Sequence, residues 1–132
     1  MTEPSENAKP TVAILGASSD RQKFGNKSVR AHLAQGYTVY PINPKETEIE
    51  GLKAYKTLAD LPVKSLDRIS VYLPPPIGIK MLPDIQAANA KEVWFNPGAE
   101  SDELVKAAYE HGIDPIIACS IVDIGETPGK YQ

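Results

Sequence analysis

The residues best suited to chemistry form a turn that follows an apolar run at residues 11–16. This turn is Gly16-Ala17-Ser18-Ser19, and Lys23-Phe24-Gly25 follows shortly before a predicted helix. A strand, a tight glycine turn and a helix together offer backbone N–H groups and a positive helix end to a phosphate. The common dinucleotide fingerprint is Gly-x-Gly-x-x-Gly, but Ser18 stands at its second glycine here. We therefore expect a phosphate site that is wider than the dinucleotide turn; the alternative is an ordinary turn with solvated serines.

A second loop indicates which nucleotide would bind. An NAD site places Asp or Glu at the end of the second strand to hold a ribose hydroxyl, whereas this chain has Asn43-Pro44-Lys45. Asn43 and Lys45 can donate hydrogen bonds to a ribose phosphate instead. The loop therefore favours a nucleotide with a phosphorylated ribose, which is coenzyme A or NADP. The alternative for Lys45 is a solvated loop lysine.

Two further loops combine proline and glycine after predicted strands. Leu73-Pro74 opens a run of three prolines that can form a rigid apolar wall beside a nucleotide, or can start a helix. Asn96-Pro97-Gly98 lets the backbone approach a ligand at Gly98, or forms a plain type II turn.

Strand and helix patterns alternate along the whole chain, which predicts how these loops are positioned. Such alternation gives a parallel sheet with right-handed crossovers and helices on both faces. We expect an α/β, Rossmann-like, three-layer fold with about five to six strands, whose ligands bind outside the carboxyl ends of the strands. Asn26, Gly36 and Ser101 are expected to be an N-cap, a C′ glycine and a capping-box serine. The expected strands are 11–16, 37–43, 67–73, 92–95 and 115–119, and the expected helices are 27–35, 57–61, 77–90 and 101–111.

Length and composition limit the class of protein. The 132 residues suit one domain, and we expect a loose N-terminal arm at residues 1–9, a domain at 10–124 and a C-terminal tail at 125–132. A net charge of −3 argues against general nucleic-acid binding. A single cysteine excludes an internal disulfide and fits the cytoplasm. No run approaches the roughly 20 apolar residues that cross a bilayer, so no membrane partner is expected.

No catalytic or metal-binding group is expected. Cys119 ends an apolar strand and is interpreted as a packed small side chain, although thiol exchange with a thiol ligand stays open. His32 is expected to be solvated in mid-helix, and His111 to lie in a last helical turn. Neither histidine has a partner at metal-ligand spacing. Trp94 is expected in the core.

Several of these segments, taken together, resemble the stand-alone coenzyme A-binding domain family, which is similar to the N-terminal domain of the succinyl-CoA synthetase α subunit. The resemblance covers about residues 10–120 and implies a Rossmann-like fold with coenzyme A as the ligand. It also implies that residues 16–19, 23–25 and 43–45 contact the phosphates and ribose, with Leu73 and Pro74 beside the nucleotide. The matching pieces are Gly16–Ser19, Lys23–Gly25, residues 36–44, residues 58–62 and residues 93–99, which include Asn96, Pro97 and Gly98.

Three functions remain open at this point. The first is a non-catalytic protein that binds coenzyme A or an acyl-CoA, because the catalytic parts of succinyl-CoA synthetase lie in further domains. The second is an enzyme, either an NADP-dependent reductase or an accessory subunit of an acyl-CoA ligase. The third is a protein-interaction module with a vestigial nucleotide site. The sequence leaves the oligomeric state undetermined.

Overall fold

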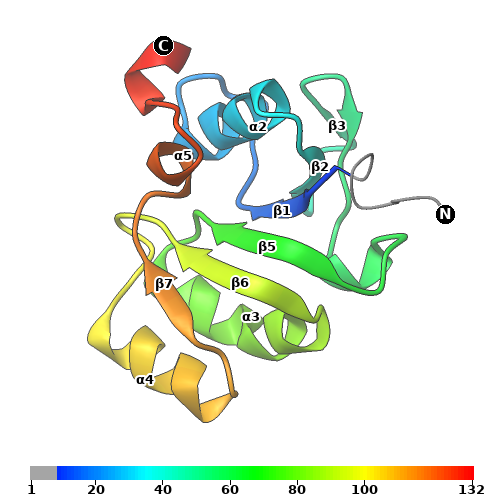
Figure 1. The fold of residues 1–132 in the computed structure, drawn as a ribbon. Coiled ribbons are helices and arrows are strands. Elements are labelled where there is room, and N and C mark those ends of the chain that lie inside the picture. The colour runs from blue at the N-terminus through cyan, green and yellow to red at the C-terminus, as the bar shows by residue number, and fades with distance from the viewer. Residues whose placement is uncertain (1–8) are drawn as a thin grey trace, which may run out of the picture.

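A parallel five-stranded sheet organises the computed structural model, which describes residues 9–132 (Figure 1). The expected N-terminal arm therefore lies outside the described residues, except for Lys9. The strand order is β2-β1-β5-β6-β7, and every neighbouring pair is parallel. This confirms the α/β Rossmann-like fold class. The strands are β1 (Thr11–Leu15), β2 (Thr38–Ile42), β5 (Leu66–Val71), β6 (Ala90–Phe95) and β7 (Pro115–Ile117).

Helices cover both faces of the sheet, as Figure 1 shows. One face carries α2 (Phe24–Ala34) and the short α5 (Ser120–Asp123), and the opposite face carries α3 (Pro75–Ala87) and α4 (Asp102–Glu110). None of the helices that the structure describes has the length and apolar character that a bilayer crossing requires.

The core has two parts, one on each side of the sheet. Side chains alternate between the faces of a strand, so Val12 and Ile14 of β1 pack toward Val29 of α2. Ala13 and Leu15 belong to the larger cluster on the α3 and α4 side. All five are buried. Because β1 is packed on both faces, the turn at its carboxyl end is attached to a rigid element.

A small excursion after β2 returns the chain to the carboxyl edge of the sheet. The hairpin β3 (Glu48–Ile49) and β4 (Leu52–Lys53) leads to Tyr55, which bridges Ile42 in parallel. The backbone N–H of Asn43 donates to the Tyr55 carbonyl at 2.9 Å. The next residues therefore lie beside the loop after β2, and a 3₁₀ helix, η1 (Leu58–Asp60), follows them.

The predicted start of the first helix is wrong. The helix begins at Phe24 with Lys23 as its N-cap, so Asn26 is not a cap but lies inside the first turn, fully buried. The other end is as expected, since Gly36 has φ +86° directly after the C-cap. Ser101 also acts as expected, because its side chain accepts a hydrogen bond from the Leu104 N–H.

The segment expected to be a C-terminal tail packs against α2 instead. It contains the 3₁₀ helix η2 (Pro128–Tyr131), and it is attached through Glu126, a buried carboxylate. This carboxylate accepts hydrogen bonds from the Tyr131 hydroxyl at 2.9 Å and from the Lys130 amine at 3.2 Å. It also accepts one from the side chain of Gln35, which is the C-cap residue of α2. The contact between Glu126 and Gln35 joins residues 91 positions apart, and such a contact leaves no periodic signal in the sequence.

The histidine expected to be solvated is also buried. His32 is 0% exposed, its Nδ1 lies 2.8 Å from the Ser28 carbonyl, and its ring meets Tyr37 edge-on. Burial lowers the pKa of His32 to about 4. Its i, i+4 spacing from Ser28 places it on the face of α2 that packs against the protein. Trp94 is buried as predicted, whereas Cys119 is only half-buried and lies after the end of β7.

Candidate functional site

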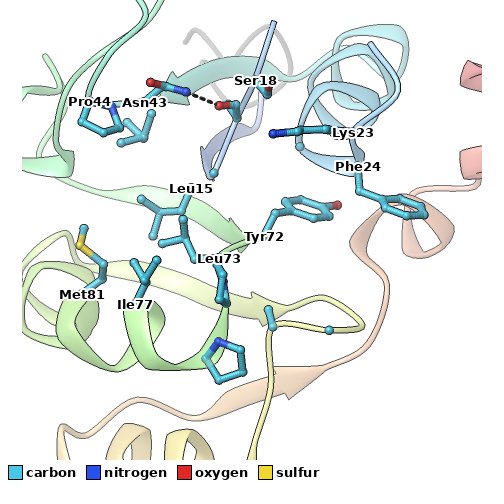
Figure 2. Close-up of a pocket in the computed structure, with 18 of the residues that line it drawn as sticks. Leu15, Ser18, Lys23, Phe24, Asn43, Pro44, Tyr72, Leu73, Ile77 and Met81 are labelled. Atoms are coloured by element: carbon cyan, nitrogen blue, oxygen red, sulfur yellow. Dashed lines mark hydrogen bonds between the residues drawn. The ribbon is translucent and has the colours of Figure 1, made fainter. Parts of the chain in front are cut away.

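A cavity of about 950 Å³ opens at the carboxyl edge of the sheet (Figure 2). The loops after β1, β2, β5 and β6 line it, together with the start of α2 and one side of α3. This is the position where open parallel sheets bind ligands, and the volume lies in the range of small-molecule sites.

Two glycines bring the β1 turn and α2 into close contact. Gly16 has φ +86°, and a Cβ added there would lie 2.9 Å from the Tyr72 carbonyl oxygen. A Cβ on Gly25 would overlap the Gly16 carbonyl oxygen. Neither position therefore accepts a side chain without movement of the backbone. The absence of side chains lets the first turn of α2 abut the loop Gly16–Ser19, which we call the phosphate loop.

The N-terminus of α2 is open toward the cavity. Its N-cap residue Lys23 makes no capping hydrogen bond through its side chain, and no acidic residue lies in the first turn. The backbone N–H groups of Phe24 and Gly25 have no hydrogen-bond partner within residues 9–132. These donors, the helix dipole and the Lys23 amine make this corner suitable for an anion.

Two asparagine side chains hold the phosphate loop in place through its backbone carbonyl groups. Asn43 Nδ2 donates to the Ala17 carbonyl and Asn26 Nδ2 donates to the Ser18 carbonyl, each at 2.9 Å. The Asn43 Oδ1 also accepts hydrogen bonds from the N–H groups of Lys45 and Glu46. Asn43 is therefore a brace between two loops, although it also lines the cavity.

A carboxylate occupies one donor of the phosphate loop. The Ser19 N–H donates to Glu46 Oε2 at 2.9 Å, and hydrogen bonding to Ser19 lowers the pKa of the Glu46 carboxyl. Ser19 is exposed and does not line the cavity. The Ser19 N–H is thus satisfied within the chain, unlike the N–H groups at the start of α2.

The opposite wall of the cavity is largely apolar. Leu73, Ile77 and Met81 face it together in Figure 2, and Pro74 extends this wall at the start of α3. Asp84 lies one further turn along α3 on the same side, since residues four and three apart share a helix face. One end of the cavity therefore suits phosphate, and the other suits a flat or apolar group.

Most of the residues predicted from sequence meet at this cavity. Three of them do not line it: Ser19, Lys45 and Asn96. The three-proline run starts a helix, as one of the two expectations had it, because Pro74 is the N-cap of α3. Pro74 also lines the cavity, and its place beside a nucleotide stays a prediction. The predicted residues that line the cavity are Gly16, Ala17, Ser18, Lys23, Phe24, Gly25, Asn43, Pro44, Leu73, Pro74, Pro97 and Gly98.

Asn96 belongs to a buried hydrogen-bond network behind the cavity. Its Nδ2 donates to Ser70 Oγ at 2.8 Å, and its Oδ1 accepts from the Ser120 N–H at 2.8 Å. Ser120 Oγ also lies 3.1 Å from the Tyr72 hydroxyl, and burial raises the pKa of Tyr72. Because Asn96 is 1% exposed, its visible role is to join β5, β6 and α5.

Sequence reasoning missed one polar wall of the cavity. Lys56 and Thr57 line it because Tyr55 pairs with the end of β2, and this pairing has no sequence signature. The missed positions Ile77, Met81 and Asp84 did carry a signal, namely their helical spacing on the segment after the prolines. Tyr72 lines the floor of the cavity at the end of β5.

A parallel sheet with a phosphate-type turn and an open helix end defines a Rossmann-like nucleotide-binding domain. The family described as CoA binding domain matches residues 10–124, so this chain belongs to that family.

Comparison with solved structures supports the same assignment. A conserved hypothetical protein from Pyrococcus furiosus is 33% identical with a TM-score of 0.77, and the match covers 88% of this chain and 99% of that chain. An acetyl-coenzyme A synthetase from Ca. Korarchaeum cryptofilum is 29% identical with a TM-score of 0.70, and the match covers 89% of this chain and 28% of the synthetase chain.

Curated relatives are larger proteins. The acetate–CoA ligase (ADP-forming) I of Archaeoglobus fulgidus is 27% identical over 112 residues, which are 77% of this chain and 16% of the ligase. The ligase II subunit alpha of Pyrococcus furiosus is 41% identical over 54 residues, which are 39% of this chain and 11% of that subunit. The chain thus spans less than a fifth of these relatives. The family and the relatives are named for coenzyme A, and they give no support to NADP as the nucleotide.

Proposed function

We propose that this domain binds coenzyme A or an acyl-CoA and holds it without catalysing a reaction. The observation that carries the proposal is the open start of α2 beside a braced phosphate loop, within a cavity of a CoA-binding domain. An anionic ligand at this end of the cavity would pair with the backbone N–H groups of Phe24 and Gly25 and with the Lys23 amine, and would be stabilised by the helix dipole.

The pyrophosphate would lie at this corner. Gly16, Ala17 and Ser18 would present backbone and hydroxyl donors, and Lys23 would supply a cation. Phe24 and Gly25 would contribute the helix N–H groups. The pyrophosphate is the part of coenzyme A that best matches this set of donors.

The ribose 3′-phosphate would lie toward the loop after β2. Asn43 orders this loop, Pro44 forms its wall and Lys45 supplies a cation at its exposed tip. Lys56 provides a second cation on the cavity wall itself. The apolar parts of the ligand would contact Leu73 and Pro74 in the loop after β5, and Pro97 and Gly98 in the loop after β6. Asn96 would hold the loop after β6 in place, because its Nδ2 donates to the Val71 carbonyl.

The lining of the cavity argues for binding rather than turnover. Acid–base catalysis most often uses histidine, and cysteine is the strongest side-chain nucleophile; the described lining contains neither. Cys119 lies outside it. We expect no ATP formation when the purified chain is given acetyl-CoA, ADP and phosphate; ATP formation would show that the domain is catalytic.

Isothermal titration with coenzyme A and with dephospho-CoA tests the ligand assignment. We expect coenzyme A to bind and dephospho-CoA to bind at least about tenfold more weakly, because one charge-assisted contact is lost. Equal affinities would remove the ribose-phosphate role of the loop after β2. No binding of either compound would favour the interaction module with a vestigial site.

Two matched variants decide which lysine holds that phosphate. Lys45→Glu is expected to weaken coenzyme A by about 1–3 kcal/mol, as for a charge-assisted contact, and to leave dephospho-CoA almost unchanged. Lys56→Glu makes the same change of charge on the cavity wall. If only Lys56→Glu removes the preference for coenzyme A, the phosphate is held by Lys56 and not by Lys45.

A further inference from the structure

We propose that the C-terminal segment Glu126–Tyr131 is part of the binding machinery and positions the phosphate loop through Arg30 and Asn26. The segment lies beyond residues 10–124, where the family match ends. The inference rests on the proposed function, since the phosphate loop is taken to hold the pyrophosphate.

A continuous series of hydrogen bonds joins the segment to the loop. The Ser18 carbonyl accepts from Asn26 Nδ2 at 2.9 Å, and Asn26 Oδ1 accepts from Arg30 Nε at 2.7 Å. Arg30 Nη2 donates to the Tyr131 carbonyl at 2.7 Å and to the Arg21 carbonyl at 2.9 Å. Ser18 and Tyr131 are thus connected by two side chains of α2.

Arg30 determines which way the Asn26 amide points. A guanidinium has donors and no acceptor, so the Asn26 oxygen must face it, and the Asn26 NH₂ group must face the loop. There the NH₂ group donates to the Ser18 carbonyl and to Glu50 Oε2, both at 2.9 Å. A reversed amide would place its oxygen against two acceptors. Asn26 is 0% exposed, so water does not replace these bonds.

The C-terminal segment in turn holds Arg30. The guanidinium carbon lies 5.3 Å from the centre of the Tyr131 ring, and the Tyr131 carbonyl accepts its hydrogen bond. Tyr131 is fixed by its hydroxyl, which donates to the buried Glu126 carboxylate at 2.9 Å. Glu126 also accepts from Gln35 of α2 and from Lys130. The segment is therefore attached at both of its ends.

The effect on binding follows from pre-organisation. Fixing the Ser18 carbonyl away from the cavity fixes the orientation of the whole peptide unit, and a loop already in its bound conformation loses less entropy when the ligand arrives. Without the Arg30 contacts the loop samples other orientations, and the pyrophosphate meets fewer aligned donors.

The test measures the affinities of coenzyme A and of adenosine 3′-monophosphate, which lacks the pyrophosphate. We expect Arg30→Ala and Glu126→Ala each to weaken coenzyme A about tenfold, with little change for adenosine 3′-monophosphate. Arg30→Lys should not rescue, because an ammonium lacks the planar fork that reaches three acceptors. Lys106→Ala, an exposed change of the same charge on α4, is the control and should leave both affinities unchanged.

A double-mutant cycle separates positioning from general destabilisation. If the segment acts through Arg30, Glu126→Ala adds almost nothing to the loss already caused by Arg30→Ala. Independent, multiplying losses would overturn the proposal, as would variants that bind coenzyme A like the wild type or that lose both ligands equally. A wild-type chain that binds no coenzyme A would instead overturn the proposed function.

Discussion

Among the helices that start at the carboxyl edge of the sheet, α4 and α2 differ in how their first turns are capped. At α4, Ser101 Oγ accepts from the Leu104 N–H at 3.0 Å, and Asp102 and Glu103 lie in the first turn. At α2, the N-cap side chain makes no such bond, and acidic residues are absent from the first turn. Helix ends are ordinarily satisfied by side chains or water. The contrast shows that α4 is capped by its own chain, whereas the uncapped start of α2 is where we propose that the pyrophosphate binds.

The open helix depends on its packing for stability. One side of α2 is buried and includes Gly25, Ser28 and His32. Toward its C-terminal end, α2 is attached to the C-terminal segment, because Arg30 donates to the Tyr131 carbonyl and Gln35 donates to Glu126. Without a cap, the first turn of α2 has no side-chain hydrogen bond to its N–H groups, so tertiary contacts decide the position of the helix. The contrast between α2 and α4 can be tested at four positions.

Gly25→Ala should have the largest effect. The added Cβ overlaps the Gly16 carbonyl oxygen, so α2 and the phosphate loop must separate. We expect coenzyme A affinity to fall about 100-fold, and the free energy of unfolding to fall by about 1–3 kcal/mol through overpacking. Titration calorimetry and urea unfolding measure the two effects. Lys106→Ala, an exposed change on α4 far from this contact in the chain, is the control. Equal affinities and equal free energies of unfolding for the two variants would show that the close contact at Gly25 affects neither binding nor stability.

Acid should destabilise the protein through His32 on the buried side of α2. Burial lowers the folded-state pKa from 6.5 to about 4, so below pH 6.5 the unfolded chain binds more protons than the folded chain. Stability is fully present above pH 6.5 and falls as the pH approaches 4, by about 3 kcal/mol when complete.

Urea unfolding at pH 7, 6 and 5 measures this slope. The variant His32→Gln cannot titrate at this position and should lose most of the slope over that interval, where carboxylates contribute least. A variant that keeps the wild-type slope would show that another group causes the acid sensitivity.

Lys23→Asp should convert the open helix start into one like that of α4. Lys23 has the extended backbone of an N-cap residue (φ −83°, ψ 147°), so an aspartate there can accept a first-turn N–H. We expect the free energy of unfolding to rise by up to about 1 kcal/mol, while coenzyme A weakens by about 1.5–3 kcal/mol. Lys23→Ala, which removes the cation without adding a cap, should lose affinity without gaining stability. A gain in both properties would contradict the assignment of this corner to an anion.

Ser101→Ala is expected to have the smallest effect and serves as the reciprocal change. Removing the side chain that caps the Leu104 N–H should cost about 1 kcal/mol of stability. Coenzyme A affinity should stay the same, because Ser101 does not line the cavity. A large loss of affinity would show that the two helix starts are coupled.

The sequence predicted those parts of the site that depend on local chemistry. The Gly16 turn, the proline wall at Pro74 and the Gly98 turn each follow from residue type and from the position after a strand. Parallel topology then brings these loops to one edge without further information.

Other parts depend on contacts between distant residues. Lys56 reaches the cavity because Tyr55 pairs with Ile42, and Arg30 meets Tyr131 across 101 positions of the chain. The predicted start of α2 lies three residues beyond the observed start at Phe24, because Gly25 is a poor helix former. Only the close contact between Gly25 and Gly16 explains why a glycine stands in the first turn. Asn96 shows the limit of the loop argument, since a polar residue after a strand can join neighbouring elements rather than contact a ligand.

The single tryptophan of the chain provides a built-in optical probe. Trp94 is 7% exposed on β6, its indole N–H donates to Glu92, and the Arg68 guanidinium lies 4.9 Å from its ring. It does not line the cavity. Its fluorescence should therefore change when the sheet unfolds and should respond little to a ligand at the carboxyl edge. Emission from Trp94 and the heat of titration can thus be recorded on the same sample as separate reports of folding and of binding.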